Sequence, residues 1–184
     1  MKVVAIVQAR MGSTRLPNKV MKPITGLPMI ELLLSRLVKA KEVDQIIVAT
    51  SLDQKNLPLS KYVRELGYDC EEGSEDDVLD RYFQAAKKHK ADVVVRITGD
   101  CPLVDPDLVD EVIRQFKSID VDYFSNTIPP TYPDGLDIEV CTFKALEQAH
   151  KESTEKFDRE HVTPYLRDPG KYKTGSLQYS EDLS

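Results

Sequence analysis

Positively charged and small residues gather directly after the first apolar stretch of the chain. Residues 3–7 are apolar, and the loop that follows contains Arg10, Gly12, Ser13, Arg15 and Lys19. Residues 1–30 contain no aspartate or glutamate, although the whole chain carries a net charge of −6. Backbone N–H groups of such a loop can bind phosphate oxygens, while basic side chains neutralise the remaining charge. The loop is therefore a candidate anion site; the alternative is a solvated surface turn.

A carboxylate follows a second apolar stretch at the equivalent place. The mainly apolar run 92–97 is followed closely by Asp100. Proteins hold Mg²⁺ with one or two carboxylates together with phosphate oxygens. If both runs are parallel strands of one sheet, their carboxyl ends meet at the edge where ligands bind. Arg10, Lys19 and Asp100 would then hold a phosphate group and its metal ion; the alternative for Asp100 is a turn residue before Pro102.

These side chains must be positioned by a regular alternation of strands and helices. Short apolar runs predict strands, and apolar residues repeating every three or four positions predict helices. The expected strands are 3–7, 46–49, 68–71, 92–97, 122–125, 136–140 and 173–179. The expected helices are 28–41, 56–67, 74–86 with Ser74 as its cap, 105–116, 144–151 and 156–165. The pattern predicts an α/β fold with a doubly wound, mostly parallel sheet. All 184 residues are expected to form one domain, with a small α+β excursion near 126–166.

Composition argues against several classes of protein. The sequence contains no run of eighteen apolar residues and no signal-peptide pattern. The negative net charge argues against duplex DNA or a membrane surface as the main partner. The cysteines are odd in number and far apart, which favours a reducing compartment without disulfides. We therefore expect a cytoplasmic protein that binds neither nucleic acid nor membrane.

Three further residues could contact a substrate. Asp137 and Glu139 are two positions apart in the expected strand 136–140, so their side chains share one of its sides. They could reach substrate hydroxyl groups or a second metal ion; the alternative is a solvent-facing pair on an edge strand. His161 could donate a hydrogen bond to an anionic group, and its alternative is a structural or exposed histidine.

Five motifs spread over the whole chain resemble one enzyme family. They are VQARMGSTRLPNKV (7–20), GSEDDVLDRY (73–82), RITGDCPLVDP (96–106), DGLDIEV (134–140) and REHVTPYL (159–166). The sequence resembles the cytidylyltransferases that make CMP-sugars, such as the acylneuraminate and CMP-KDO synthetases. The branch named for spore coat polysaccharide biosynthesis is the most similar.

The resemblance implies a Rossmann-like fold of the nucleotide-diphospho-sugar transferase type, with CTP as donor, Mg²⁺ as cofactor and pyrophosphate as product. It implies that the triphosphate is faced by Arg10, Gly12, Ser13, Arg15 and Lys19. It also places the base near the Ala9 backbone and the segment starting at Ser74, and a metal ion at Asp100. The loop 129–137 and the segment 159–166 would line the sugar. Family members are often homodimers, and 126–166 is the expected interface.

The sequence departs from the family pattern near its end. Members continue into a strand whose aspartate completes the metal site, whereas this sequence ends at Ser184, so Asp137 or Glu139 would have to substitute. Three functions stay open. One is CMP transfer from CTP to an acidic or amino sugar, for surface or spore coat polysaccharide. The second is nucleotide binding without turnover. The third is transfer to another phosphorylated acceptor, which would need a second basic cluster drawn from Lys144, Arg159 and Arg167.

Overall fold

A computed structural model describes residues 1–13 and 16–184. Its main sheet has seven strands: β1 (Val3–Gln8), β4 (Gln45–Ser51), β5 (Asp69–Gly73), β6 (Val93–Thr98), β7 (Tyr123–Ser125), β8 (Glu139–Thr142) and β9 (Thr174–Ser176). Their order is β5-β4-β1-β6-β8-β7-β9. A separate two-stranded ribbon, absent from the sequence prediction, consists of β2 (Pro23–Ile24) and β3 (Leu27–Pro28).

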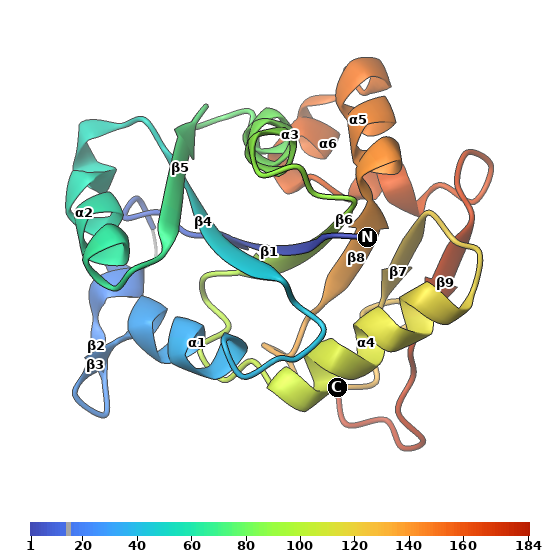
Figure 1. Cartoon of the computed structure of the whole chain (residues 1–184), viewed down its shortest axis with the longest axis horizontal. Helices are drawn as coiled ribbons and strands as arrows, with labels where there is room; N and C mark the ends of the chain where they lie inside the picture. The colour runs from blue at the N-terminus through green and yellow to red at the C-terminus, as the bar shows by residue number, and fades with distance from the viewer. Residues whose placement is uncertain (14–15) are drawn as a thin grey trace.

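The sheet is mostly parallel and is covered by helices on both faces, as predicted. Only β8 runs antiparallel to its neighbours, β6 and β7. One face carries α3 (Val78–Lys88), α5 (Phe143–Glu152) and α6 (Lys156–His161). The other carries α1 (Met29–Leu37), α2 (Leu57–Glu65) and α4 (Pro106–Ser118), as Figure 1 shows. Because β1 lies between both layers, Val3 to Val7 are fully buried, which explains their continuous apolar run.

The two helices after β5 and β6 each begin at an aspartate whose side chain caps the helix. The side chain of Asp105 accepts hydrogen bonds from the backbone N–H groups of Asp107 and Leu108, so α4 is capped as predicted. The prediction that Ser74 caps α3 is wrong, because the cap is Asp77. Ser74 Oγ instead accepts from the Asp77 N–H at 3.0 Å. This turn leaves the backbone around Ser74 in the loop between β5 and α3.

The predicted strand over 136–140 is displaced in the structure. β8 begins at Glu139, and the exposed Asp137 lies before it. Glu139 is only 3 % exposed, because β8 lies inside the sheet and pairs Glu139 with Arg96 on β6. Asp137 and Glu139 therefore do not form a solvent-facing pair on an edge strand. The alternating pattern was typical of an edge, but a buried ion pair produces the same pattern.

The segment 126–166 is integrated into the main fold. It supplies β8 to the sheet, and its helices α5 and α6 pack against α3. The Phe83 ring on α3 stacks on the His150 ring of α5 with 4.2 Å between ring centroids. The Phe83 ring also stacks on the Phe143 ring, with 5.8 Å between their centroids. No helix in the described ranges is long and apolar enough to cross a membrane.

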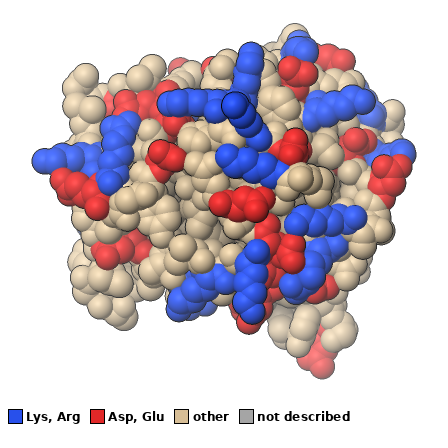
Figure 2. Space-filling model, viewed as in Figure 1, with Lys and Arg blue, Asp and Glu red and all other residues tan. Residues whose placement is uncertain are grey.

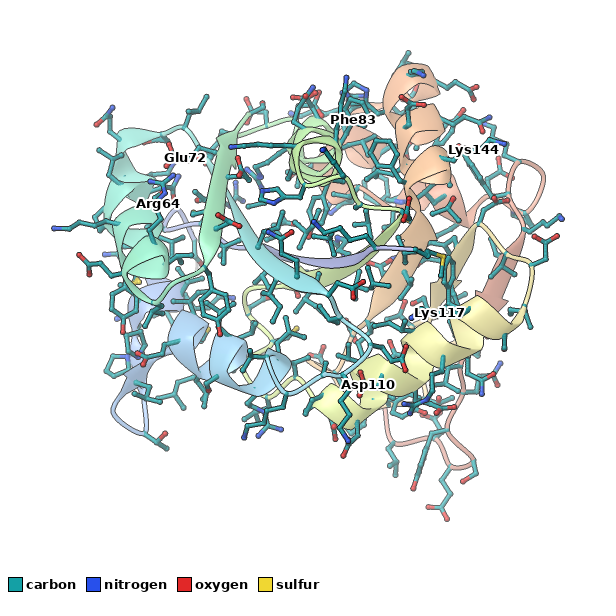
Figure 3. The ribbon with its side chains drawn as sticks, viewed as in Figure 1. Arg64, Glu72, Phe83, Asp110, Lys117 and Lys144 are labelled. Carbon is teal, nitrogen blue, oxygen red and sulfur yellow. The ribbon has the colours of Figure 1, made fainter. Side chains whose placement is uncertain are left out.

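The surface carries both signs of charge. Figure 2 shows basic and acidic side chains interspersed over the face viewed. Many of them form ion pairs between elements, such as Arg64 of α2 with Glu72 of β5 at 2.8 Å, both labelled in Figure 3. Buried Asp110 of α4 accepts from the backbone N–H groups of Lys41 and Glu42, which fixes the turn before β4. These contacts join α2 to β5 and α4 to the segment before β4.

Candidate active site

The carboxyl ends of β1 and β6 lie side by side where the strand order reverses. β4 and β5 lie to one side of β1 and β6 to the other, and Gln8 pairs with Thr98. Ligands of open α/β sheets bind in the crevice at such a point. The two chains approach closely, since the Gly99 N–H donates to Gln8 O at 2.7 Å. A Cβ at Gly99 would lie 2.7 Å from that oxygen, so this contact requires glycine.

A cavity of about 260 Å³ opens over this crevice, and we call it the Lys19 cavity. It is lined by five residues of the predicted site, namely Ala9, Arg10, Ser13, Lys19 and Asp100. The remaining lining residues are Gln8, Val20, Thr98 and Gly99. The structure thus brings the basic loop and the carboxylate together. Predicted site residue Arg15 lies outside the described residues.

An ion pair crosses the Lys19 cavity. Lys19 Nζ donates to Asp100 Oδ2 at 3.0 Å, joining the loop after β1 to the end of β6. Partial burial alone would raise the pKa of Asp100, but hydrogen bonds from Lys19 and Thr98 hold that pKa below its ordinary value. Asp100 is therefore a carboxylate at neutral pH and can bind a cation.

The side chain of Asn56 fixes the basic loop by a hydrogen bond to the loop's backbone, a contact that the sequence did not reveal. Its side chain is 1 % exposed and accepts from the Met11 N–H at 2.8 Å. It also donates to Ser51 Oγ at 2.6 Å. Gly12, predicted to contact phosphate, lies in this anchored part of the loop against the side chain of Lys55. The expected helix over 56–67 marked Asn56 only as a helix start, so no signal pointed to this contact.

Glu75 connects the basic loop to the segment after β5, and it too was missed. It accepts from Arg10 Nη1 at 3.4 Å, from Lys55 Nζ at 3.1 Å and from Ser51 Oγ. Burial raises the pKa of Glu75, but the hydrogen bonds from Ser51 and Lys55 outweigh it and lower the pKa. The neighbouring Ser74, predicted near a base, lies outside the Lys19 cavity. Among the described residues, the contact of Glu75 with Arg10 links this segment to that cavity.

His161 faces a second cavity, of about 210 Å³, which we call the His161 cavity. Its walls include Gln8 and Arg10, shared with the Lys19 cavity, and Glu75. α6 therefore brings His161 to the Arg10 side of the site. The sequence predicted that the segments containing His161 and Asp137 would line the same sugar site. In the structure they lie apart, because Asp137 lines another cavity.

This third cavity has a volume of about 240 Å³, and we call it the Arg167 cavity. It shares Thr98 with the Lys19 cavity and is otherwise lined by Arg96, Thr127, Asp137, Glu139 and Arg167. Partial burial of its carboxyl group at the cavity wall and the nearby negative charges of Asp134 and Glu139 raise the pKa of Asp137. Glu139 is engaged by Arg96 and Arg167, whereas among the described residues no arginine forms an ion pair with Asp137.

The carboxylates present fit a magnesium ion that takes most of its ligands from phosphate oxygens and water. Asp100 and Asp137 line adjacent cavities, and oxygen donors of this kind suit Mg²⁺. The raised pKa of Asp137 reflects partial burial and nearby negative charges that outweigh the positive charge of Arg96, and a cation would relieve both effects. Within the described ranges, no group of three or more His, Cys, Asp or Glu side chains forms a metal cage. Phosphate oxygens and water would have to complete the coordination.

The sequence matches the family described as "Cytidylyltransferase" over residues 4–181, a range that includes all three cavities. The chain belongs to the cytidylyltransferase family. This confirms the resemblance seen in its motifs. It is 34% identical over 185 residues to the spore coat polysaccharide biosynthesis protein SpsF of Bacillus subtilis, covering 97% of this chain and 76% of that protein. It is 43% identical over 186 residues to an uncharacterized protein, MJ1063, of Methanocaldococcus jannaschii, covering 100% of this chain and 74% of that protein.

Solved structures agree with the family and the fold. A cytidylyltransferase from Leptospira borgpetersenii superposes with a TM-score of 0.95 at 32% identity, over 100% of this chain and 79% of that chain. A CMP:2-keto-3-deoxy-manno-octonic acid synthetase complexed with CTP superposes with a TM-score of 0.76 at 19% identity, over 97% of this chain and 91% of that chain. The second match shows the fold alone, and it confirms the predicted nucleotide-diphospho-sugar transferase type.

Proposed function

We propose that this cytidylyltransferase transfers CMP from CTP to a sugar hydroxyl group and releases pyrophosphate. The observation that carries the proposal is the Lys19 cavity, where a basic loop and Asp100 face each other at the strand-order reversal. A triphosphate with a divalent cation matches that arrangement of charges. A protein of the same fold was solved with CTP, which supports the choice of nucleotide.

The loop residues would hold the triphosphate. Arg10 and Lys19 supply positive charge, and the backbone near Gly12 and Ser13 supplies N–H groups. Asp100, with Asp137, would hold the magnesium ion, which when bound supplies charge neutralisation for the departing pyrophosphate. The acceptor oxygen forms a bond to the α-phosphorus as the bond to the β-phosphate oxygen breaks, and the hydroxyl proton passes to solvent. The protein therefore acts by positioning and by stabilising charge.

The base would lie against the segments that Glu75 and Arg10 connect. We place the cytosine between the Ala9 backbone and the loop beginning at Ser74. For the acceptor we propose an acidic or amino sugar destined for surface or spore coat polysaccharide, on the strength of the similarity to SpsF. His161 and Asp137 would then contact the acceptor from two different cavities. We further propose that the protein is cytoplasmic and forms a homodimer through 126–166. Light scattering would test whether the protein is a dimer.

The test is pyrophosphate release with Mg²⁺ and each nucleoside triphosphate, over a panel of acidic, amino and neutral sugars. Turnover is expected with CTP and a subset of the acidic or amino sugars. The second candidate is nucleotide binding without turnover, because the two carboxylates proposed to hold the metal ion, Asp100 and Asp137, line different cavities. That candidate predicts CTP binding by calorimetry with no pyrophosphate from any sugar. A protein that bound neither CTP nor UTP with Mg²⁺ would contradict both.

A further inference from the structure

A charged side chain is buried against the loop that joins β5 to α3 (Figure 1). Arg81, near the start of α3, is only 2 % exposed. Among the described residues no carboxylate forms an ion pair with it, and the nearby Glu75 pairs with Arg10 and with Lys55. The Nε and Nη2 atoms of Arg81 are buried without a hydrogen-bond partner in the described part of the chain. A positive charge is thus buried there without a counter-ion.

Such a charge is costly for stability. Burial of an ion without an ion-pair partner is unfavourable, and an apolar side chain of similar volume is often neutral or stabilising in its place. Burial also lowers the pKa of Arg81, and the negative charge of Glu75 does not compensate for it. Methionine or leucine would fill the same space in α3 without this cost. The guanidinium group must therefore be explained by the contact that it makes.

That contact is a hydrogen bond to the backbone of the loop. Arg81 Nη1 donates to the carbonyl oxygen of Ser74 at 2.8 Å. The stem of the side chain packs against Gly73, where a Cβ would come within 3.1 Å of Arg81 Cγ. Ser74 Oγ accepts from the Asp77 N–H at 3.0 Å, which closes the turn. Arg81 thus holds the end of β5 and the first residue of the loop in one arrangement.

The loop that Arg81 supports forms a wall of the His161 cavity. Glu75 and Asp76 line that cavity, together with Gln8 and Arg10. Glu75 also accepts a hydrogen bond from Arg10, which lines the Lys19 cavity as well. Arg81 itself lines neither of these two cavities. Its effect on a ligand would therefore pass through the loop.

We propose that Arg81 is a positioning residue for recognition of the nucleobase, and that its hydrogen bond to Ser74 holds the loop in the conformation that contacts the base. The inference rests on the proposed function, which gives the base to the space between the Ala9 backbone and this loop. A guanidinium group is planar and charged, so it fixes the direction of a carbonyl group more firmly than a neutral donor does. The triphosphate is held by the loop after β1, so its binding does not depend on Arg81.

The experiment titrates three probes with Mg²⁺ into the full chain by calorimetry: CTP, UTP and inorganic tripolyphosphate. Tripolyphosphate has the anionic groups of CTP without the nucleoside, and UTP differs from CTP only in the base. Arg81→Met removes the charge, whereas Arg81→Lys keeps the charge and a donor. Arg64→Met is the control, because Arg64 also donates to a backbone carbonyl, that of Cys70 at 3.0 Å, but within β5 rather than in the loop. Thermal unfolding checks that each variant is folded.

We expect wild type to bind CTP about tenfold or more tightly than either reference probe. Arg81→Met should lower CTP affinity about tenfold and leave tripolyphosphate affinity unchanged, because the loop loses a charge-assisted hydrogen bond. Arg81→Lys should retain part of both preferences, and Arg64→Met should retain them fully. Gly73→Ala carries the test if Arg81→Met does not fold. Its Cβ would displace the stem of Arg81, so it should lower CTP affinity alone, to a smaller extent.

The inference is overturned if Arg81→Met, or Gly73→Ala in its place, keeps either wild-type preference for CTP. It is also overturned if tripolyphosphate affinity falls in parallel with CTP affinity, because Arg81 then supports the fold as a whole. Failure of the proposed function gives a different result. Wild type itself would then lack one or both preferences for CTP, and the base contact that Arg81 supports would not exist.

Discussion

Lys19 Nζ and Asp100 Oδ2 lie 3.0 Å apart, and this contact joins the loop after β1 to the end of β6. Each charge neutralises the other across the Lys19 cavity. Under the proposed function the two residues exchange partners when CTP binds, Lys19 facing phosphate and Asp100 facing a cation. Their separate contributions can therefore be measured by substituting each one.

Asp100→Asn should abolish magnesium-dependent turnover. The amide keeps the shape of the side chain but loses the charge that would hold the cation. Stability should change by no more than about 1 kcal/mol, because the side chain of Asp100 is 49% exposed and its ion pair is screened by solvent. Magnesium titrations of pyrophosphate release measure the first effect and urea unfolding the second. Asp120→Asn, at a carboxylate 92% exposed, is the control. An unchanged magnesium dependence would rule out Asp100 as a ligand.

Lys19→Ala should weaken CTP binding while the protein stays folded. Loss of one charge-assisted contact to phosphate costs about 1.5–3 kcal/mol, which corresponds to a rise in Kd of roughly tenfold to a hundredfold. Lys22→Ala is the matched control, since Lys22 is an exposed lysine three positions further along that does not line the cavity. Calorimetric titration with CTP and Mg²⁺ measures both. Equal affinities of the two variants would remove Lys19 from the site.

Asn56→Ala should lower stability and CTP affinity together. The substitution leaves the Met11 N–H without its 2.8 Å partner and Ser51 without its buried donor, at a cost of about 1–3 kcal/mol. The basic loop also loses its anchor, so its groups are no longer held in position for a triphosphate. Gln54→Ala, two residues earlier and exposed, should change neither quantity. Loss of stability without loss of affinity would show that the anchor does not position the loop.

Gly99→Ala should destabilise the protein far more than Gly12→Ala. A Cβ at Gly99 would lie 2.7 Å from Gln8 O and 2.9 Å from Ala9 Cβ, both fixed by β1. A Cβ at Gly12 would meet the end of the Lys55 side chain at 2.8 Å, and that flexible chain can move away. Such overpacking against backbone typically costs about 1–3 kcal/mol. Thermal unfolding of the two variants gives the comparison, and equal midpoints would contradict the close contact of β1 with β6.

The sequence predicted the parts of the fold that depend on local pattern. The run Val3 to Val7 predicted a doubly covered strand, and Asp105 with Pro106 predicted the start of α4, because burial and capping leave signals within a few residues. The alternation at Asp137 and Glu139 was misleading. A buried ion pair to β6 and a solvent-facing edge produce the same pattern, and only the sheet order distinguishes them.

The sequence predicted the part of the candidate site where basic residues cluster in an otherwise acidic chain. Lys19 and Asp100 were paired because strand ends of one sheet must meet. Asn56 and Glu75 were missed because their partners lie far away along the chain, and nothing in their own surroundings indicates those contacts. The position of His161 depended on how α6 packs against α3, which is a tertiary relationship that no local pattern encodes.

Glu75 should make stability depend on pH in the acid range. Its pKa is lowered in the folded protein, because the hydrogen bonds from Ser51 and Lys55 and the charge of Arg10 outweigh the effect of burial. A lowered pKa means that the stabilisation is complete above the unfolded value, about 4.3, and is lost as pH falls through the folded value. Glu75→Gln should therefore cost about 1 kcal/mol at pH 7 and progressively less as the pH falls below about 4.

Urea unfolding of wild type and Glu75→Gln across pH 3 to 7 measures this difference, with Glu65→Gln as the control. Glu65 is 59% exposed and faces only Lys61 in the described part of the chain, so its substitution should leave the pH profile nearly unchanged. If the free energies of unfolding of wild type and Glu75→Gln differed by the same amount at every pH, ionisation of Glu75 would not be the source of the stabilisation. The contact with Arg10 would then act through packing alone, and the loop would not be held by charge.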